Sequence, residues 1–265
     1  MTSSAEAYAR AKAEGRAALV GYLPAGFPSY DGCIEALTAM VDAGVDIVEL
    51  GLPYSDPVID GPTIQAAAEI ALRNGTGTAH VLRTVEAVAA TGVPVMVMTY
   101  WNPVLHYGID TFARDLVAAG GSGLITPDLI PDEAGEWIEV SDAASLERIF
   151  LVAPSSTPAR VQSTAEACRG WIYAASTMGV TGAREATSSV APGLVERVRA
   201  VSDLPVGVGL GVSNGAQAAE VASYADGVIV GSAFVRPLLD DAGATGVKAV
   251  AALAADLAAG VRRRG

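Results

Sequence analysis

The chain alternates short apolar runs with longer amphipathic stretches along almost its whole length. The apolar runs are of strand length, rich in β-branched residues and continuous rather than alternating, as strands buried on both faces of a parallel sheet require. They are Ala17–Leu23, Asp46–Gly51, Val95–Tyr100, Gly123–Thr126, Ile149–Ala153, Trp171–Ala175, Val206–Gly209 and Gly227–Val230.

The amphipathic stretches between these runs predict helices, and several open on start signals such as Pro158 after Thr157. They are Cys33–Val41, Thr63–Asn74, Thr78–Ala90, Thr111–Ala119, Glu133–Val140, Ala159–Ala167, Gly193–Ala200, Gln217–Ser223 and Ala244–Ala259. Strands and helices alternating at about thirty residues predict a (β/α)8 TIM barrel, with a doubly wound open sheet as the alternative. We expect one domain over residues 1–265, with an extra helix at Thr2–Glu14 capping the barrel bottom.

Composition narrows the possible partners. A formal charge of −12 and a pI near 4.5 argue against nucleic acid or an anionic membrane surface. The mean hydropathy of +0.38 raises the question of a membrane, but the excess is mostly alanine and no uninterrupted apolar run reaches the ~20 residues of a spanning helix. The N-terminus lacks a signal pattern, and Cys33 and Cys168 lie far apart, so a reduced, cytoplasmic setting is expected.

Glu49 is the first candidate for chemistry. In this fold, catalytic groups lie at the C-terminal ends of strands, and Glu49 is an acid within an apolar run, at that end. Between Val48 and Leu50 it should be partly desolvated, which would raise its pKa and make it a proton donor near neutrality. The alternative is a buried glutamate paired with an arginine, although no arginine occupies a predicted strand end.

Asp60 is the second candidate. It lies in the polar loop that follows, where a carboxylate should stay ionised and accept a proton or a hydrogen bond. Two acids in contrasting environments divide naturally into donor and acceptor. Asp60 precedes Gly61 and Pro62, so it could equally be the cap of the next helix. Asp56, before Pro57, is favoured as a turn residue.

Glycines after the last two strands predict an anion site. Gly207, Gly209 and Gly211 run from the seventh strand toward a helix, and Gly231-Ser232-Ala233 ends the eighth strand and opens another helix. The loops at these two positions, with a helix N-terminus, commonly bind phosphate in this fold through backbone amides. Tight packing is the alternative explanation of the glycines.

Other features restrict the mechanism. The loop Ser176–Ala191 is long and predicts an active-site lid. Tyr173 and Tyr100, at the sixth and third strands, are as compatible with packing as with ligand contact. His80 in a helix and His106 in a loop have no clustered partner, so no metal or triad is expected. Lysine occurs only at Lys12 and Lys248, away from strand ends, which argues against a Schiff-base aldolase.

These motifs resemble the tryptophan synthase alpha subunit family across nearly the whole chain. Residues 48–65 (VELGLPYSDPVIDGPTIQ) match its signature, and Tyr173 with Gly179-Val180-Thr181-Gly182, Tyr100-Trp101-Asn102-Pro103 and the two glycine sites match further stretches. The resemblance implies cleavage of indole-3-glycerol phosphate to indole and glyceraldehyde 3-phosphate.

The resemblance also implies residue roles. Glu49 would protonate indole C3 and help deprotonate the glycerol hydroxyl, Asp60 would hold the indole N–H, and Tyr173 would support the acid. Amides of Gly182, Gly211, Val212, Gly231 and Ser232 would bind the phosphate. The indole pocket would be lined by Tyr22, Ile64, Tyr100 and Leu210, with Thr181 bonding Asp60 on lid closure. Tyr22 and Leu210 depart from the family, where phenylalanine is common.

The family implies a partner. A beta subunit carrying pyridoxal phosphate would receive the indole in an αββα assembly, contacting Leu52–Asp60 and the region of Asn102 and Asp128, while this chain would hold no cofactor. A stand-alone lyase releasing free indole would share every catalytic residue. A non-catalytic, phosphate-binding activating subunit is a third possibility, and a phosphosugar epimerase would need metal ligands at strand ends.

Overall fold

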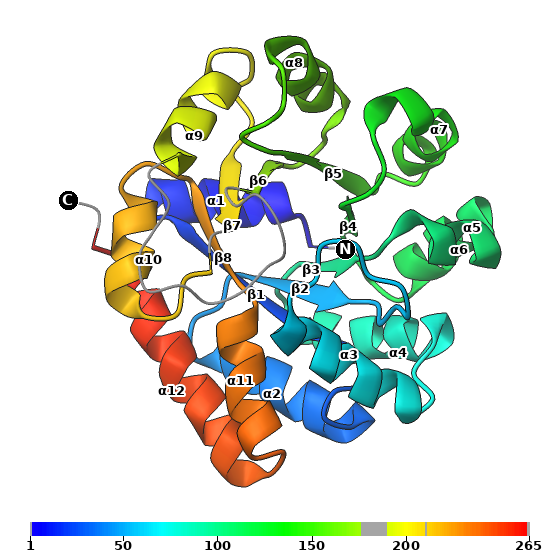
Figure 1. The fold of residues 1–265 in the computed structure, drawn as a ribbon, viewed down its shortest axis with the longest axis vertical. Coiled ribbons are helices and arrows are strands. Elements are labelled where there is room, and N and C mark those ends of the chain that lie inside the picture. Colours follow the sequence, from blue (N-terminus) through cyan, green and yellow to red (C-terminus); the bar gives the residue numbers. More distant parts are fainter. Residues whose placement is uncertain (1, 176–189, 210, 264–265) are drawn as a thin grey trace.

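The computed structural model describes residues 2–175, 190–209 and 211–263. Its eight strands form a closed barrel in sequence order, each parallel to its neighbours (Figure 1). The predicted (β/α)8 barrel is therefore confirmed, and the open sheet is excluded. The strands are β1 (Ala18–Pro24), β2 (Ile47–Gly51), β3 (Val95–Met98), β4 (Gly123–Thr126), β5 (Glu147–Val152), β6 (Ile172–Ala175), β7 (Val206–Gly209) and β8 (Gly227–Val230).

Helices surround the barrel as expected, with differences after β3 and β8. The helices at predicted positions are α1 (Ser4–Ala13), α2 (Tyr30–Asp42), α3 (Pro62–Arg73), α4 (Thr78–Ala89), α6 (Ile109–Ala118), α7 (Gly135–Ala143), α8 (Pro158–Ala167), α9 (Ala191–Arg199), α10 (Gly215–Ala222) and α12 (Ala244–Val261). The sequence predicted the start of α11 (Ser232–Asp240), at Gly231-Ser232-Ala233, but not its extent, and it did not predict α5 (Trp101–Tyr107) or the 3₁₀ turn η1 (Pro131–Glu133).

Both α5 and α11 contain a proline. Pro103 lies in the first turn of α5, where the missing N–H costs nothing, and Pro237 lies inside α11, where a helix is normally disfavoured. Two predictions are corrected as a result. Tyr100 is the N-cap of α5 rather than the end of β3, and His106 lies in α5 rather than in a loop.

Alternate strand residues face the barrel interior and form a compact apolar cluster. Its strand members are Ala18, Val20, Ile47, Met96, Ile125, Ile149 and Ile229, and Trp171, directly before β6, belongs to it as well. The intervening residues face outward and pack against the helices in a larger core. Both strand faces are thus buried, which is why the strands read as continuous apolar runs.

Helix α1 closes the N-terminal end of the barrel, and Figure 1 shows it lying across the strands. The Glu147 carboxylate, at the start of β5, accepts hydrogen bonds from the Ser3 hydroxyl (2.7 Å) and from the amides of Ser4 (3.1 Å) and Ala5 (3.2 Å). A carboxylate at a helix N-terminus is favoured by the helix dipole. Tyr8, only 2% exposed, extends from α1 into the barrel interior cluster.

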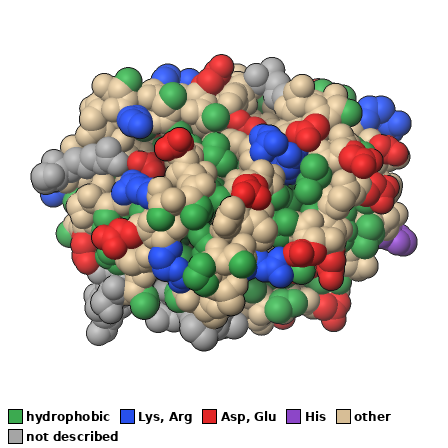
Figure 2. Space-filling view, turned by 90° about the horizontal axis from the view of Figure 1, so that it is seen from above, with side chains coloured by type: hydrophobic (Ala, Val, Ile, Leu, Met, Phe, Trp, Pro, Cys, Tyr) green, Lys and Arg blue, Asp and Glu red, His purple; other side chains and the backbone are tan. Residues whose placement is uncertain are grey.

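Helix α12 is, within the described residues, the one helix long and apolar enough to cross a membrane by length and composition. It packs along α10, α2 and α11, and Asp256 accepts a hydrogen bond from the Gly215 amide (2.6 Å). This is the packing of an outer barrel helix, which passes the same test without a membrane. The side of the barrel seen in Figure 2 carries acidic and basic side chains interspersed among apolar ones.

Candidate active site

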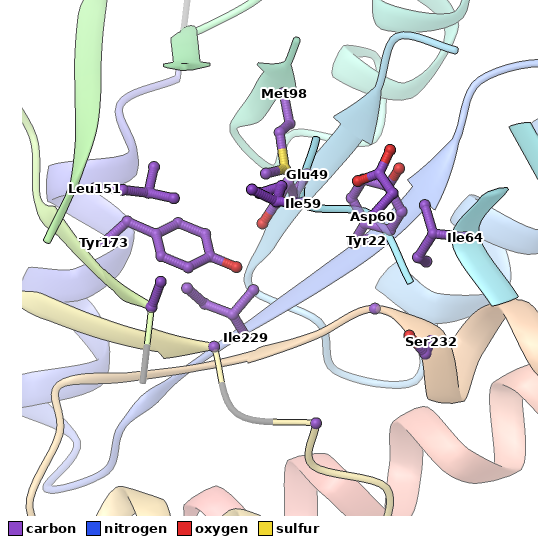
Figure 3. Close-up of a pocket in the computed structure, with 14 residues that line it drawn as sticks. Tyr22, Glu49, Ile59, Asp60, Ile64, Met98, Leu151, Tyr173, Ile229 and Ser232 are labelled. Atoms are coloured by element: carbon purple, nitrogen blue, oxygen red, sulfur yellow. The ribbon is translucent and has the colours of Figure 1, made fainter. Parts of the chain in front are cut away.

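A pocket opens at the C-terminal end of the barrel, with an empty volume of about 710 Å³ that includes space open to solvent. Most of its lining residues lie at strand ends or in the loops that follow the strands. The lining residues are Tyr22, Glu49, Ile59, Asp60, Ile64, Met98, Leu151, Tyr173, Ala175, Gly209, Gly211, Ile229, Gly231 and Ser232. The pocket lining therefore includes residues from three predicted groups: the two acids, the indole-pocket residues and the glycines (Figure 3).

Glu49 is buried at the pocket floor, with 1% of its surface exposed. It pairs in register with Tyr22 of β1 and Met96 of β3. Its Oε2 atom has no hydrogen-bond partner among the described residues, and none of their arginines pairs with it. Within the described residues, Glu49 is therefore not the arginine-paired glutamate of the alternative interpretation. Burial, and next the charge of Asp60, raises the pKa of Glu49 from 4.5 to about 8.

Asp60 follows β2 in the loop and faces the same pocket (Figure 3). It does not cap the next helix, because the N-cap of α3 is Gly61 and no side chain caps that helix. Burial raises the pKa of Asp60 from 3.8 to about 6, while the Tyr100 hydroxyl acts in the opposite direction. Asp60 is thus less solvated than its polar loop predicted, but it still loses its proton before Glu49 does.

Tyr173 directs its hydroxyl into the cavity from β6, toward the region of Glu49 and Ile229 (Figure 3). Burial, and next the charge of Glu49, raises the pKa of this phenol well above its ordinary value. Tyr22 lines the neighbouring wall, and its phenol pKa is raised by burial and then by the charges of Asp60 and Glu49. Both phenols are therefore neutral hydrogen-bonding groups beside the acids.

Tyr100 does not line this pocket but supports it from behind. It is 5% exposed, and its hydroxyl accepts hydrogen bonds from the amides of Val58 and Ile59, both at 3.0 Å. Its ring packs on Tyr54, with ring centres 5.3 Å apart. Tyr100 therefore anchors the loop that carries Asp60. Position alone could not distinguish this role from a ligand contact.

The glycines divide into two groups. Gly211, with a φ of +72°, lines the pocket together with Gly231 and Ser232, the N-cap and first residue of α11. The first turn of α11 holds no acidic residue, so its amides and dipole favour an anion there. Val212 is 2% exposed and belongs to the core. The predicted residues Thr181, Gly182 and Leu210, and the predicted lid apart from Val190 and Ala191, lie outside the described residues.

Gly207 and Gly209 serve packing. A Cβ on Gly207 would lie 2.6 Å from the Tyr8 hydroxyl and 2.8 Å from the Trp171 ring, and one on Gly209 would lie 2.6 Å from the Tyr173 hydroxyl. The alternation of glycine along β7 thus makes room for aromatic rings of β6 and α1. The packing explanation is correct for these two glycines.

Five lining residues were not predicted: Ile59, Met98, Leu151, Ala175 and Ile229. Four of them are the last or next-to-last inward-facing positions of their strands, so the period of two along each strand could have identified them.

Metal and Schiff-base chemistry have no candidates in the described part of the chain. Its His, Cys, Asp and Glu residues form no group of three or more that could hold a metal ion. Lys12 and Lys248 lie on α1 and α12 and do not reach the pocket.

A parallel barrel with a buried and a partly buried carboxylate and a helix N-terminus at its C-terminal mouth is typical of (β/α)8-barrel enzymes. The sequence model of the family described as "Tryptophan synthase alpha chain" matches residues 8–262. The tryptophan synthase alpha chain of Salinispora arenicola is 63% identical over 257 residues, covering 97% of this chain and 96% of that protein. The protein of the same name from Acidothermus cellulolyticus is 64% identical over 263 residues, covering 99% and 98%.

Solved structures agree. A Mycobacterium tuberculosis tryptophan synthase chain superposes with a TM-score of 0.93 at 58% identity, covering 99% of each chain. The Legionella pneumophila tryptophan synthase subunit alpha gives a TM-score of 0.88 at 31% identity, covering 98% of each. The chain therefore belongs to the tryptophan synthase alpha chain family.

Proposed function

We propose that the chain cleaves indole-3-glycerol phosphate into indole and glyceraldehyde 3-phosphate by a retro-aldol reaction, as a carbon–carbon lyase. The observation that carries this proposal is Glu49, a buried carboxyl whose Oε2 has no partner among the described residues and which faces the pocket shared with Asp60. A pKa of about 8 keeps Glu49 protonated at neutral pH, so it can act as an acid.

The reaction uses one acid and one base. Glu49 gives its proton to indole C3, and Asp60 accepts a hydrogen bond from the indole N–H and stabilises the positive charge that develops on the ring. The Glu49 carboxylate then takes the proton of the hydroxyl on the carbon attached to C3. As that hydroxyl becomes the aldehyde, the C–C bond breaks and its electron pair returns to the indole ring, which regenerates protonated Glu49. Tyr173 donates a hydrogen bond at the same site. No step needs a cofactor in this chain.

The proposed substrate orientation follows from the positions of the helix N-terminus and the apolar lining residues. The phosphate would lie at the α11 N-terminus on amides of Gly211, Gly231 and Ser232, with Val212 and Gly182 as the remaining donors we propose. The indole would lie among Tyr22, Ile64 and the apolar residues near Asp60. We further propose that Thr181 and Leu210 complete the site from above.

We also propose that a tryptophan synthase beta chain, which would hold pyridoxal phosphate, docks over the loops beside the pocket in an αββα assembly in the cytoplasm. Three large apolar side chains are exposed there: Val58 (72%), Leu105 (52%) and Ile130 (39%). They follow β2, β3 and β4, on the same end of the barrel as the pocket. Exposed apolar residues in two loops and in α5, which follow neighbouring strands, form a surface suited to a partner.

The loops of this surface are linked to each other. The Asn102 side-chain amide donates to the Tyr54 hydroxyl (3.2 Å), and both carboxylate oxygens of Asp128 accept from the Trp101 amide (3.0 and 3.1 Å). A partner bound here would therefore contact the loop that carries Asp60 and the elements that support it.

Indole release by the purified chain, alone and with a beta chain, tests the proposal. Slow release alone with strong acceleration by the beta chain is the expected result. Fast release with no response would indicate a stand-alone lyase, and no release in either case would refute the catalytic proposal. Glu49→Gln should lower turnover at least about 100-fold, the low end for a general acid–base. Glu69→Gln, an exposed change on α3, is the matched control and should have normal activity.

A further inference from the structure

An aromatic column runs through the barrel interior from α1 to the pocket. Tyr8 contacts Trp171 with ring centres 5.6 Å apart, and Trp171 stacks on Tyr173 at the same distance with an interplanar angle of 29°. Trp171 precedes β6 by one residue and Tyr173 lies within it, two positions on, so both point inward. The Tyr173 end of the column reaches the pocket, and Trp171 does not.

Packing, rather than hydrogen bonding, fixes the column. The Tyr8 hydroxyl and the Trp171 indole nitrogen are both buried and have no hydrogen-bond partner among the described residues. The space for Tyr8 and Trp171 exists because Gly207 and Gly227 carry no side chains, and Gly209 leaves space for Tyr173 in the same way. A stack held by shape alone loses its geometry when one ring is removed, since a buried void is filled only by movement of its neighbours.

We propose that Trp171 is a positioning residue: its ring, held by Tyr8 against β7, keeps the Tyr173 hydroxyl beside Glu49. The helix that closes the barrel bottom thereby sets the geometry at the barrel mouth. The kinetic part of this inference rests on the proposed function, but the placement of Tyr173 beside Glu49 does not.

Removal of the Trp171 ring should also change the environment of Glu49. The titratable groups that act on Glu49, or on which it acts, are Asp60 from the loop after β2, Tyr22 from β1, Tyr173 from β6 and Tyr8 from α1, and all of them are acidic. Burial is the main cause of the raised pKa of Glu49. A void beneath Tyr173 would let the phenol drop and water approach the carboxyl, which lowers that pKa.

The matched control is Trp137, on α7. Like Trp171, it is fully buried and its indole nitrogen has no partner among the described residues, but it packs on Trp101 in the outer core, away from the pocket. Trp137→Leu and Trp171→Leu therefore remove the same side chain at comparable burial. A purely structural role predicts the same consequences for both.

The experiment combines a carbon-13 NMR titration of the Glu49 carboxyl with kcat and KM for indole release. Trp171→Leu should lower the Glu49 titration midpoint by at least about one pH unit, because it exposes the carboxyl. It should lower kcat at least about tenfold, with a smaller change in KM. A tenfold loss corresponds to an increase of about 1.4 kcal/mol in the activation free energy when Tyr173 is less well oriented. Trp171→Phe should change both in the same direction by less, and it replaces Trp171→Leu if that variant does not fold.

Trp137→Leu should leave the titration midpoint and kcat at the wild-type values despite a comparable loss of thermal stability. An unchanged Glu49 midpoint and kcat in both Trp171 variants would overturn the proposal, as would an equal shift in Trp137→Leu. If the wild-type chain released no indole, the proposed function would fail, and the NMR titration, which needs no turnover, would still decide the role of Trp171.

Discussion

The Tyr173 hydroxyl lies against the backbone of Gly209, so closely that a Cβ on that glycine would be 2.6 Å from the phenol oxygen. Tyr173 and Gly207 are register partners on β6 and β7, and Gly209 is the next inward position along β7. At the pocket floor, the Tyr173 phenol of β6 thus fills the space that Gly209 of β7 leaves open by having no side chain.

Replacing Gly209 by alanine should therefore move Tyr173. Real Cβ atoms essentially never approach other atoms so closely, so the partly buried ring, which lines the pocket, must shift. We expect turnover to fall about tenfold or more, and the destabilisation to be partly relieved in a Tyr173→Phe background, where the nearest atom is absent. Activity and thermal melts of the two single variants and the double variant measure both effects.

Gly193→Ala is the control for this series. Gly193 lies in α9, and a Cβ there would have no heavy atom of another element within 4 Å among the described residues. It should leave turnover unchanged and stabilise the helix by up to about 1 kcal/mol. Normal turnover in Gly209→Ala, with Tyr173 unmoved in a crystal structure, would contradict the account of β7.

The rate should depend on pH with a maximum between the titrations of the two acids. Asp60 must be ionised, which requires a pH above about 6, and Glu49 must be protonated, which requires a pH below about 8. A profile of kcat/KM should therefore rise near pH 6 and fall near pH 8, with apparent values that belong to the interacting pair. Asp60→Asn should abolish the rising limb. A profile that is flat from pH 5 to 9 would refute this assignment.

Glu49 should make the protein less stable as the pH rises from about 4.5 to about 8. Its pKa is 4.5 when exposed and about 8 in the folded chain, so between these values the folded state holds a proton that the unfolded state has lost. Stability then falls as pH rises through this range, by about 1.4 kcal/mol per pH unit and up to about 5 kcal/mol in all. Glu49→Gln removes this dependence.

The free energy of unfolding of Glu49→Gln should therefore exceed that of the wild type, and the difference should grow from pH 5 to pH 8. Denaturant titrations at several pH values measure it, with Glu69→Gln as the control that shows no such trend. A constant difference across this range would mean that Glu49 titrates normally in the folded protein.

Much of this architecture could be predicted from the sequence, because its signals are local. Continuous apolar runs identified all eight strands, and the place of Glu49 at the end of one of them identified a desolvated acid. What escaped prediction depends on contacts between distant segments. Nothing near Gly207 in the sequence shows that Tyr8 occupies its space, and nothing near Tyr100 shows that its hydroxyl binds the amides of Val58 and Ile59.

The same limit explains the misjudged environment of Asp60. The polar neighbours of Asp60 in the loop predicted a solvated carboxylate, whereas the fold turns it into the pocket and raises its pKa to about 6. The extent of α11 escaped prediction for a different reason. Pro237 lies inside this helix, where proline is unfavourable in isolation, and packing against the barrel overrides that local preference. Helix α5 was missed although Pro103, in its first turn, is at a position where proline is tolerated.

The Tyr100 hydroxyl should be necessary for the position and acidity of Asp60. Tyr100→Phe leaves the amides of Val58 and Ile59 without their acceptor and removes the interaction that lowers the pKa of Asp60. The pKa of Asp60 should then rise, so the rising limb of the pH profile should move above pH 6. The value of kcat/KM at pH 7 should fall by about tenfold, the effect expected when the free energy of about one hydrogen bond is lost in the transition state. Tyr107→Phe, whose hydroxyl donates to Asp115 (2.9 Å) on the outer helices, is the control and should leave the profile unchanged. If both variants kept the wild-type profile, Tyr100 would be a packing residue only, and the loop that carries Asp60 would be held by its remaining contacts.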